Sequence, residues 1–173
     1  MQPTHSSRRI LLPVKSWFII ASIVLALILN LIPTGSVPAI PDWVALVLAF
    51  WSVREPLKIG MVNGFLLGLV MDVAYGTVLG QHSLGYVLVI YIAAGFSRRI
   101  LWFPLFKQAL QVLPMLLAMQ AVMVGARLLA GGAFPGWSYF LSSFTAALLW
   151  VPLNYLLLLP QFRPEDKDET RPI

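Results

Sequence analysis

Long apolar runs separated by short polar segments make up most of this chain. A helix needs about 20 apolar residues to cross the hydrocarbon core of a membrane. The runs predict six membrane-spanning helices, at Trp17–Ile32, Ile40–Val53, Ile59–Tyr75, Ser83–Ser97, Leu105–Ala130 and Trp137–Leu159.

The second of these helices, Ile40–Val53, is shorter than a membrane requires. Its apolar stretch would cover only about 20 Å of the hydrocarbon. We therefore expect it to be tilted by its neighbours, flanked by thinned bilayer or partly re-entrant, and these alternatives stay open.

The composition agrees with a membrane protein. Apolar residues make up 59% of the 173 positions and charged residues 11%, and the mean hydropathy is +0.83. Soluble domains carry roughly 25% charged residues. We predict an all-α integral membrane protein with a basic segment at 1–16, a six-helix transmembrane domain at 17–160 and a polar tail at 161–173. Cysteine is absent, which excludes a disulfide framework and a thiolate metal site.

Lysine and arginine are distributed unevenly between the two sides of this predicted bundle. If the six predicted helices cross the membrane one after another, all 12 lysine and arginine residues except Arg127 fall in segments on the same side of it. Cytoplasmic segments carry the excess of positive charge, so the distribution predicts an even number of spans with both termini in the cytoplasm. It also explains the net charge of +5 without a nucleic-acid partner, because no contiguous basic stripe is present.

Aromatic residues near the ends of the predicted helices are typical of anchors at the two membrane surfaces. Trp43, Tyr75, Trp137 and Tyr139 would mark the outer surface, and Trp17, Trp51 and Trp102 the inner one. The alternative for the first helix is a cleaved signal peptide that ends at Val37-Pro38-Ala39. Its long apolar run and the neighbouring prolines favour retention.

Gly60, Gly64 and Gly68 recur every four residues in the third predicted helix, and the same register reaches Asp72. Residues four apart share one face of a helix, and bare backbone lets another helix approach closely in lipid. We expect the glycines to form a close-packing seam within the bundle, with a helix of another protein as the alternative neighbour.

Asp72 stands out because a carboxylate within a membrane is costly. Two interpretations stay open. It is a polar anchor for a partner helix, a ligand or an internal cation, or it reaches the outer interface. Arg127 is a candidate counter-ion, although its side chain also fits snorkelling to the outer headgroups. Gly76 and Gly80 follow in register and are predicted turn residues, so the helix enters an outer loop here.

The start of the second predicted helix adds further candidates. Proline suits a first helical turn, and aspartate near a helix N-terminus suits the helix dipole. The predicted partner or packing face is Gly60, Gly64, Gly68 and Asp72, and the outer-loop candidates are Asp42, Trp43, Gly76, Gly80, Gln81 and His82.

Catalytic chemistry finds little support in the sequence. Asp72, His82 and Ser83 are the residue types of a hydrolytic triad, but their spacing does not signal one. Nucleophile elbows and phosphate-binding loops are missing from the sequence, and the carboxylate cluster Glu165, Asp166, Asp168 and Glu169 lies in the polar C-terminal tail. We expect no enzymatic activity, no metal and no cofactor.

Short motifs follow one another along the chain in a characteristic order and spacing. They are Pro41-Asp42-Trp43, Phe50-Trp51, Arg54-Glu55-Pro56, Gly64-Phe65, Gly68-Leu69, Asp72, Gly76, Gly80-Gln81, Leu84 and Tyr91, with Trp150-Val151-Pro152-Leu153-Asn154 in the last helix. The order and spacing of these motifs give the chain a resemblance to the MreD family of rod shape-determining proteins. This resemblance implies a multi-pass subunit of the bacterial inner membrane, within the cell-wall elongation machinery (the elongasome). That subunit is a non-enzymatic scaffold that supports peptidoglycan synthesis and rod cell shape.

The resemblance also implies partners. The bitopic protein MreC would bind directly, and the RodA glycosyltransferase and its penicillin-binding transpeptidase would belong to the same assembly. MreB filaments would be indirect partners, and membrane lipids would surround the bundle. The predicted architecture is also similar to that of the six-helix substrate-binding subunits of energy-coupling-factor transporters. This raises an alternative function, a membrane subunit that binds a small molecule or lipid inside the bundle, with Asn63, Asp72, Gln120 and Asn154 as its polar candidates.

Overall fold

The computed structural model describes residues 14–33 and 39–161. Most of the predicted N-terminal segment, the polar tail beyond Gln161 and Val37-Pro38 of the cleavage site lie outside the described residues. Within the described ranges the chain is helical and has no strand, as predicted. The elements are α1 (Ser16–Leu31), α2 (Trp43–Arg54), α3 (Met61–Tyr75), α4 (Gln81–Trp102), α5 (Leu105–Leu129), the 3-10 helix η1 (Trp137–Phe140), α6 (Leu141–Leu158) and the 3-10 helix η2 (Leu159–Gln161).

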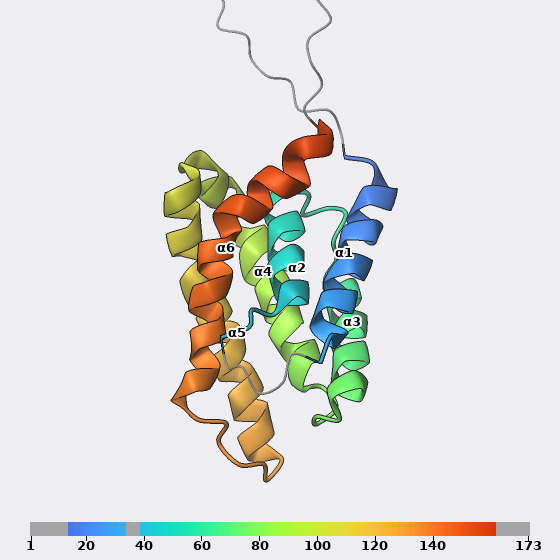
Figure 1. Cartoon of the computed structure of the whole chain (residues 1–173), viewed down its shortest axis with the longest axis vertical. Coiled ribbons are helices and arrows are strands. Elements are labelled where there is room, and N and C mark those ends of the chain that lie inside the picture. Colours follow the sequence, from blue (N-terminus) through green and yellow to red (C-terminus); the bar gives the residue numbers. More distant parts are fainter. Residues whose placement is uncertain (1–13, 34–38, 162–173) are drawn as a thin grey trace, which may run out of the picture.

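The six α-helices run alternately in opposite directions, and α1 begins at the same end of the bundle at which α6 ends (Figure 1). The helix α2 packs against α1, α4 and α6, whereas α3 packs mainly on α4, and α5 lies between α4 and α6. Two helices therefore organise the bundle, since α2 and α4 each contact at least three others.

The boundaries differ from the predicted ones chiefly at α4. This helix continues five residues beyond the predicted end at Ser97 and includes Arg98 and Arg99. Arginine is a good helix former, and its charge suits the C-terminal end of a helix. A basic pair therefore does not end the helix, even though it ends the apolar run.

The short helix α2 is buried on every side. All ten residues from Val44 to Val53 are buried, and the helix is apolar all round. A helix that is apolar on all faces belongs inside a protein rather than on its surface. Since its neighbours enclose α2, its length need not match the lipid thickness. The structure shows one continuous helix from Trp43 to Arg54, and the position of this helix relative to a membrane stays a prediction.

Trp51 corrects one of the sequence predictions. It was expected to anchor the helix at the inner membrane surface, but it is fully buried, while Trp17 is 64% and Trp102 89% exposed. Its indole Nε1–H donates to Ser22 Oγ at 2.8 Å, and Phe50 and Phe18 pack edge-on against its ring. Trp51 therefore joins α2 to α1 in the core.

Three helices are long and apolar enough to cross a membrane: Gln81–Trp102, Leu105–Leu129 and Trp137–Leu158, the last including η1. The other three, α1, α2 and α3, are apolar but shorter. Many large apolar side chains remain exposed on the outer helices, for example Leu148 at 77% and Val73 at 72%. An apolar exterior of this kind fits lipid, and the six-span count stays a prediction.

We predict that Trp51→Phe lowers the free energy of unfolding by about 2 kcal/mol, because it removes a buried hydrogen bond and part of a packed ring. Trp17→Phe, at an exposed position, is the matched control and should change stability by less than about 0.5 kcal/mol. Thermal unfolding of the purified protein followed by circular dichroism checks both values. Equal midpoints for the two variants would contradict this account of the core.

Candidate functional site

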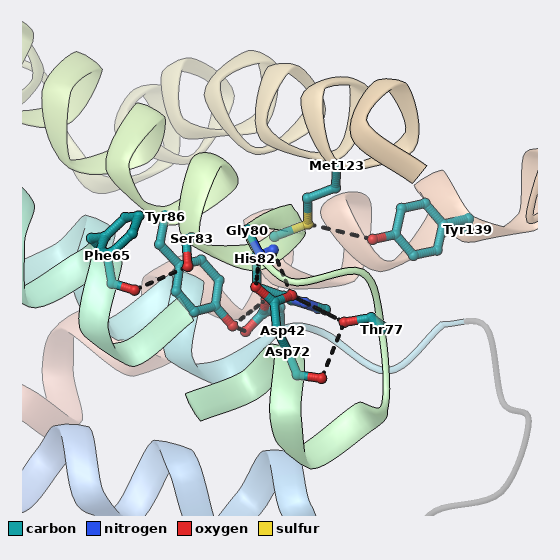
Figure 2. Close-up of polar contacts among 10 residues, drawn as sticks. All are labelled: Asp42, Phe65, Asp72, Thr77, Gly80, His82, Ser83, Tyr86, Met123 and Tyr139. Atoms are coloured by element: carbon teal, nitrogen blue, oxygen red, sulfur yellow. Dashed lines mark hydrogen bonds and ion pairs between the residues drawn. The ribbon is translucent and has the colours of Figure 1, made fainter. Parts of the chain in front are cut away.

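Asp72 is fully buried at the end of α3, where it accepts hydrogen bonds from the next helix. Its carboxylate accepts from the backbone N–H of Gly80 at 2.8 Å and of His82 at 2.9 Å. The Thr77 hydroxyl donates at 3.0 Å, and His82 Nδ1 lies 2.7 Å from the same carboxylate (Figure 2). The first helical N–H groups lack partners within their own helix. Asp72 therefore caps α4 from the neighbouring helix.

The loop between α3 and α4 turns on two glycines with left-handed backbone. Gly76 has φ +61° and Gly80 has φ +96°, conformations that L side chains rarely adopt. The N–H of Gly76 and that of Thr77 donate back to the Asp72 carbonyl, which ends α3. Both glycines are turn residues, as predicted, and they return the chain so that α4 begins beside Asp72.

A second carboxylate, Asp42, caps α2 at the same end of the bundle. It accepts from the Ala45 N–H at 3.0 Å, from Asn30 Nδ2 at 2.8 Å and from the Tyr86 hydroxyl at 2.9 Å. The Asn30 side-chain oxygen accepts in turn from the Trp43 N–H at 2.9 Å. These bonds connect α1, α2 and α4. We call this part of the molecule the Asp42/Asp72 end.

Aromatic rings join the two carboxylate networks. The His82 ring lies 5.6 Å from the Tyr75 ring and 6.0 Å from the Tyr86 ring, measured between centroids. The Tyr75 hydroxyl donates to the Asn30 carbonyl at 2.8 Å, which connects α3 to α1. The ends of four helices are therefore held together by polar side chains.

A pocket of about 560 Å³ opens at the Asp42/Asp72 end. Its polar lining residues are Asn30, Asp42, Tyr75, His82, Gln120, Tyr139 and Ser142, and Met119 and Met123 lie among its apolar ones. Gln120 is held in place, because its Nε2 donates to the Tyr139 carbonyl at 3.2 Å and its Oε1 accepts from Ser143 at 2.6 Å. The pocket thus combines a fixed polar wall with aromatic rings.

Two of the three register glycines face α4. A Cβ on Gly68 would lie 2.7 Å from the His82 carbonyl carbon and still closer to backbone atoms of Ser83, and a Cβ on Gly64 would meet Tyr86 and Ile90. A Cβ on Gly60 would meet nothing within 4 Å. The structure places Gly64 and Gly68 at an internal helix contact and Gly60 away from one.

The remaining predicted residues are not gathered into one site. Trp43 is half-buried at the start of α2, and Gln81 is buried at the start of α4 without lining the pocket. Arg127, the candidate counter-ion of Asp72, forms no ion pair within the described ranges, where the basic side chain beside Asp72 is His82. Of the other polar candidates, Asn63 faces a groove between α1 and α3, and Asn154 accepts from Arg54 Nη2 at 3.1 Å.

The three hydrolytic residue types do not form a catalytic chain. The Ser83 hydroxyl donates to the Phe65 carbonyl at 3.0 Å, while His82 is bonded to Asp72 (Figure 2). A triad requires the serine to be hydrogen-bonded to the histidine. Among the residues that the structure describes, groups of three or more side chains able to hold a metal are also absent.

Sequence reasoning missed the polar network around Asp42. Asn30 and Tyr86 lie 12 and 44 residues away from it, and neither belongs to a motif. The only signal was Asn30 itself, an amide at the end of an apolar run.

These features define a membrane protein that is helical throughout the described ranges and whose buried polar side chains mostly form hydrogen bonds within the chain, many of them to backbone groups. The model of the family "rod shape-determining protein MreD" matches residues 8–159, and the chain belongs to this family. A relative is the rod shape-determining protein MreD of Haemophilus influenzae, 32% identical over 152 residues, which cover 84% of this chain and 91% of the relative. No solved structure matches, so the likeness to energy-coupling-factor subunits stays a prediction. Membership of the family gives the chain a role in rod shape determination.

We predict that Gly68→Ala destabilises the bundle by at least about 2 kcal/mol, because the new methyl meets backbone that cannot rotate away. Gly95→Ala in α4 is the matched control, since a Cβ there meets nothing within 4 Å. Alanine favours a helix over glycine, so the control should be neutral or gain up to about 1 kcal/mol. Unfolding midpoints measure both, and a neutral Gly68→Ala would show that α3 and α4 do not pack closely there.

Proposed function

We propose that this chain is a non-enzymatic membrane scaffold of the cell-wall elongation machinery, which binds MreC and supports peptidoglycan synthesis and rod shape. The observation that carries the proposal is family membership over residues 8–159. A scaffold also fits the chemistry of the site. The Asp72 carboxylate is occupied by four donors from its own chain, and Ser83 is hydrogen-bonded away from His82.

The proposed setting is the bacterial inner membrane, with six spans and both termini in the cytoplasm. The alternating helices support it, as does the position of the start of α1 and the end of α6 at one end of the bundle (Figure 1). RodA, its penicillin-binding transpeptidase and, indirectly, MreB complete the proposed assembly.

A groove between α1 and α3 is the proposed contact for a transmembrane helix of MreC. The two helices pack on α2 and α4 rather than closely on each other, which leaves a groove of about 630 Å³. Its walls are apolar at Ile20, Val24, Leu27 and Leu66. A membrane helix associates through shape and van der Waals packing, which a groove of this kind supplies. The glycine face, by contrast, is already occupied by α4 at Gly64 and Gly68.

Filling the groove tests this function. Leu66→Trp should reduce recovery of MreC with the tagged chain at least about tenfold and should turn rods into rounded cells, because the larger ring blocks the partner helix. Leu148→Trp on α6, also at an exposed apolar position, is the matched control and should leave both readouts at wild-type level. Cell shape is observed in cells whose only copy of this protein is the variant under test.

Normal MreC recovery with Leu66→Trp would refute the groove as the contact. Failure of the unaltered chain to recover MreC, or to maintain rod shape, would refute the scaffold function itself.

The pocket at the Asp42/Asp72 end supports a second candidate function, a membrane subunit that holds a small molecule or lipid. Its volume of about 560 Å³ lies within the usual range for ligand sites, and its polar groups converge from several helices. Retention of a stoichiometric molecule by the purified chain in native mass spectrometry tests this function.

A further inference from the structure

The pocket at the Asp42/Asp72 end has a carboxylate in its lining but no lysine or arginine among the described residues that line it. The carboxylate is that of Asp42, and His82 lines the pocket as well. Within the described ranges Lys58 pairs with Glu55 and His82 Nδ1 lies 2.7 Å from the Asp72 carboxylate, and no lysine or arginine pairs with Asp42. Asp42 is half-buried, and a carboxylate withdrawn from water in this way favours a cation beside it.

Asp42 also has hydrogen-bonding capacity left. Its Oδ1 accepts from Asn30, Ala45 and Tyr86, whereas its Oδ2 accepts only from the Tyr86 hydroxyl, at 2.9 Å. An ionised carboxylate offers about four lone-pair sites, about two on each oxygen. Oδ2 can therefore accept a further hydrogen bond.

Two other polar groups in the pocket lining have unused hydrogen-bonding capacity. His82 Nδ1 faces the Asp72 carboxylate, which can only accept, so Nδ1 carries a proton and donates this bond. Nε2 has no hydrogen-bond partner among the described residues, and His82 is only 7% exposed. The Tyr139 hydroxyl donates to Met123 Sδ at 3.5 Å, which leaves the lone pairs of its oxygen unused.

We propose that this pocket binds an ammonium group. Such a group supplies positive charge and several N–H donors to the unused acceptors of the lining, and Tyr75 and Tyr139 in the same lining are aromatic residues of a type that binds cations. An anionic group is disfavoured by the two carboxylates of this end. The ligand class rests on the second candidate function, since it requires that the bundle hold a ligand. Its sources are an ethanolamine headgroup of a phospholipid or a free amine.

Native mass spectrometry of the full chain tests the proposal with two lipids of identical acyl chains. Phosphatidylethanolamine should be retained at least about tenfold more than phosphatidylglycerol, because only the former carries an ammonium group. Free ethanolamine is then added to the lipid-bound chain as a competitor, and separately to the lipid-free chain before thermal unfolding. Ethylene glycol, which is uncharged, is the control in both experiments. Displacement of the lipid by ethanolamine identifies the headgroup as the source. A raised unfolding midpoint without a lipid preference identifies a free amine.

Two variants locate the site. Asp42→Asn removes the charge but keeps a side chain that caps helices well, and Tyr139→Phe removes only a hydroxyl. Each should reduce the ammonium effect, Asp42→Asn by about tenfold. Glu55→Gln, which alters the half-buried Glu55–Lys58 pair at the other end of α2, is the matched control and should keep it. Should Asp42→Asn fail to fold by circular dichroism, Tyr139→Phe decides.

The outcomes separate the two claims. Equal retention of both lipids with no effect of ethanolamine overturns the proposal, as does an ammonium effect that the folded pocket variants leave unchanged. Retention of a molecule without an ammonium group also overturns the ligand class, but it leaves the second candidate function standing. If the chain retains no molecule and no probe shifts its midpoint, both fail.

Discussion

The hydrogen bonds that Asp72 accepts from the start of α4 are the interaction on which the rest of the structure depends. They satisfy N–H groups of Gly80 and His82 that have no acceptor within α4. They also fix the position of α4 against α3, so that Gly68 meets backbone and not a side chain. The same bonds hold His82 in place within the pocket lining. A buried carboxylate, costly by itself in an apolar bundle, here receives four donors from its own chain.

The buried helix α2 depends on comparable polar contacts at its ends. Asp42 caps its first turn and is held by Asn30 and Tyr86, while Arg54 in its last turn donates to Asn154. These contacts satisfy polar groups where the apolar helix stops. A helix of 12 residues can therefore lie inside a bundle whose outer helices reach 25 residues. The short apolar run of α2 is thus explained by its burial within the protein, and a locally thin membrane is not needed to explain it.

The sequence was sufficient for the helices but not for their contacts. Apolar runs predicted all six α-helices, and the glycines at 76 and 80 predicted the turn, because these signals are local. Asp72 was singled out, but its partner was not identified, since His82 becomes a neighbour only after the turn has formed. Trp51 was expected at the membrane surface, but it is enclosed in the core, because an apolar run does not show which of its side chains neighbouring helices will cover. The Asn30–Asp42–Tyr86 network joins residues up to 44 positions apart and left no periodic trace.

The most direct measurement of the central claim is the stability of Asp72→Asn beside Glu55→Gln, by thermal unfolding of the purified chain. The amide presents N–H groups to donors, so Asp72→Asn should lose about 3 kcal/mol, as expected for breaking a buried charged network. Glu55→Gln disturbs a half-exposed ion pair and should lose less than about 1 kcal/mol. A loss for Asp72→Asn no larger than that of Glu55→Gln would contradict the account of Asp72 as the contact that sets the fold at this end.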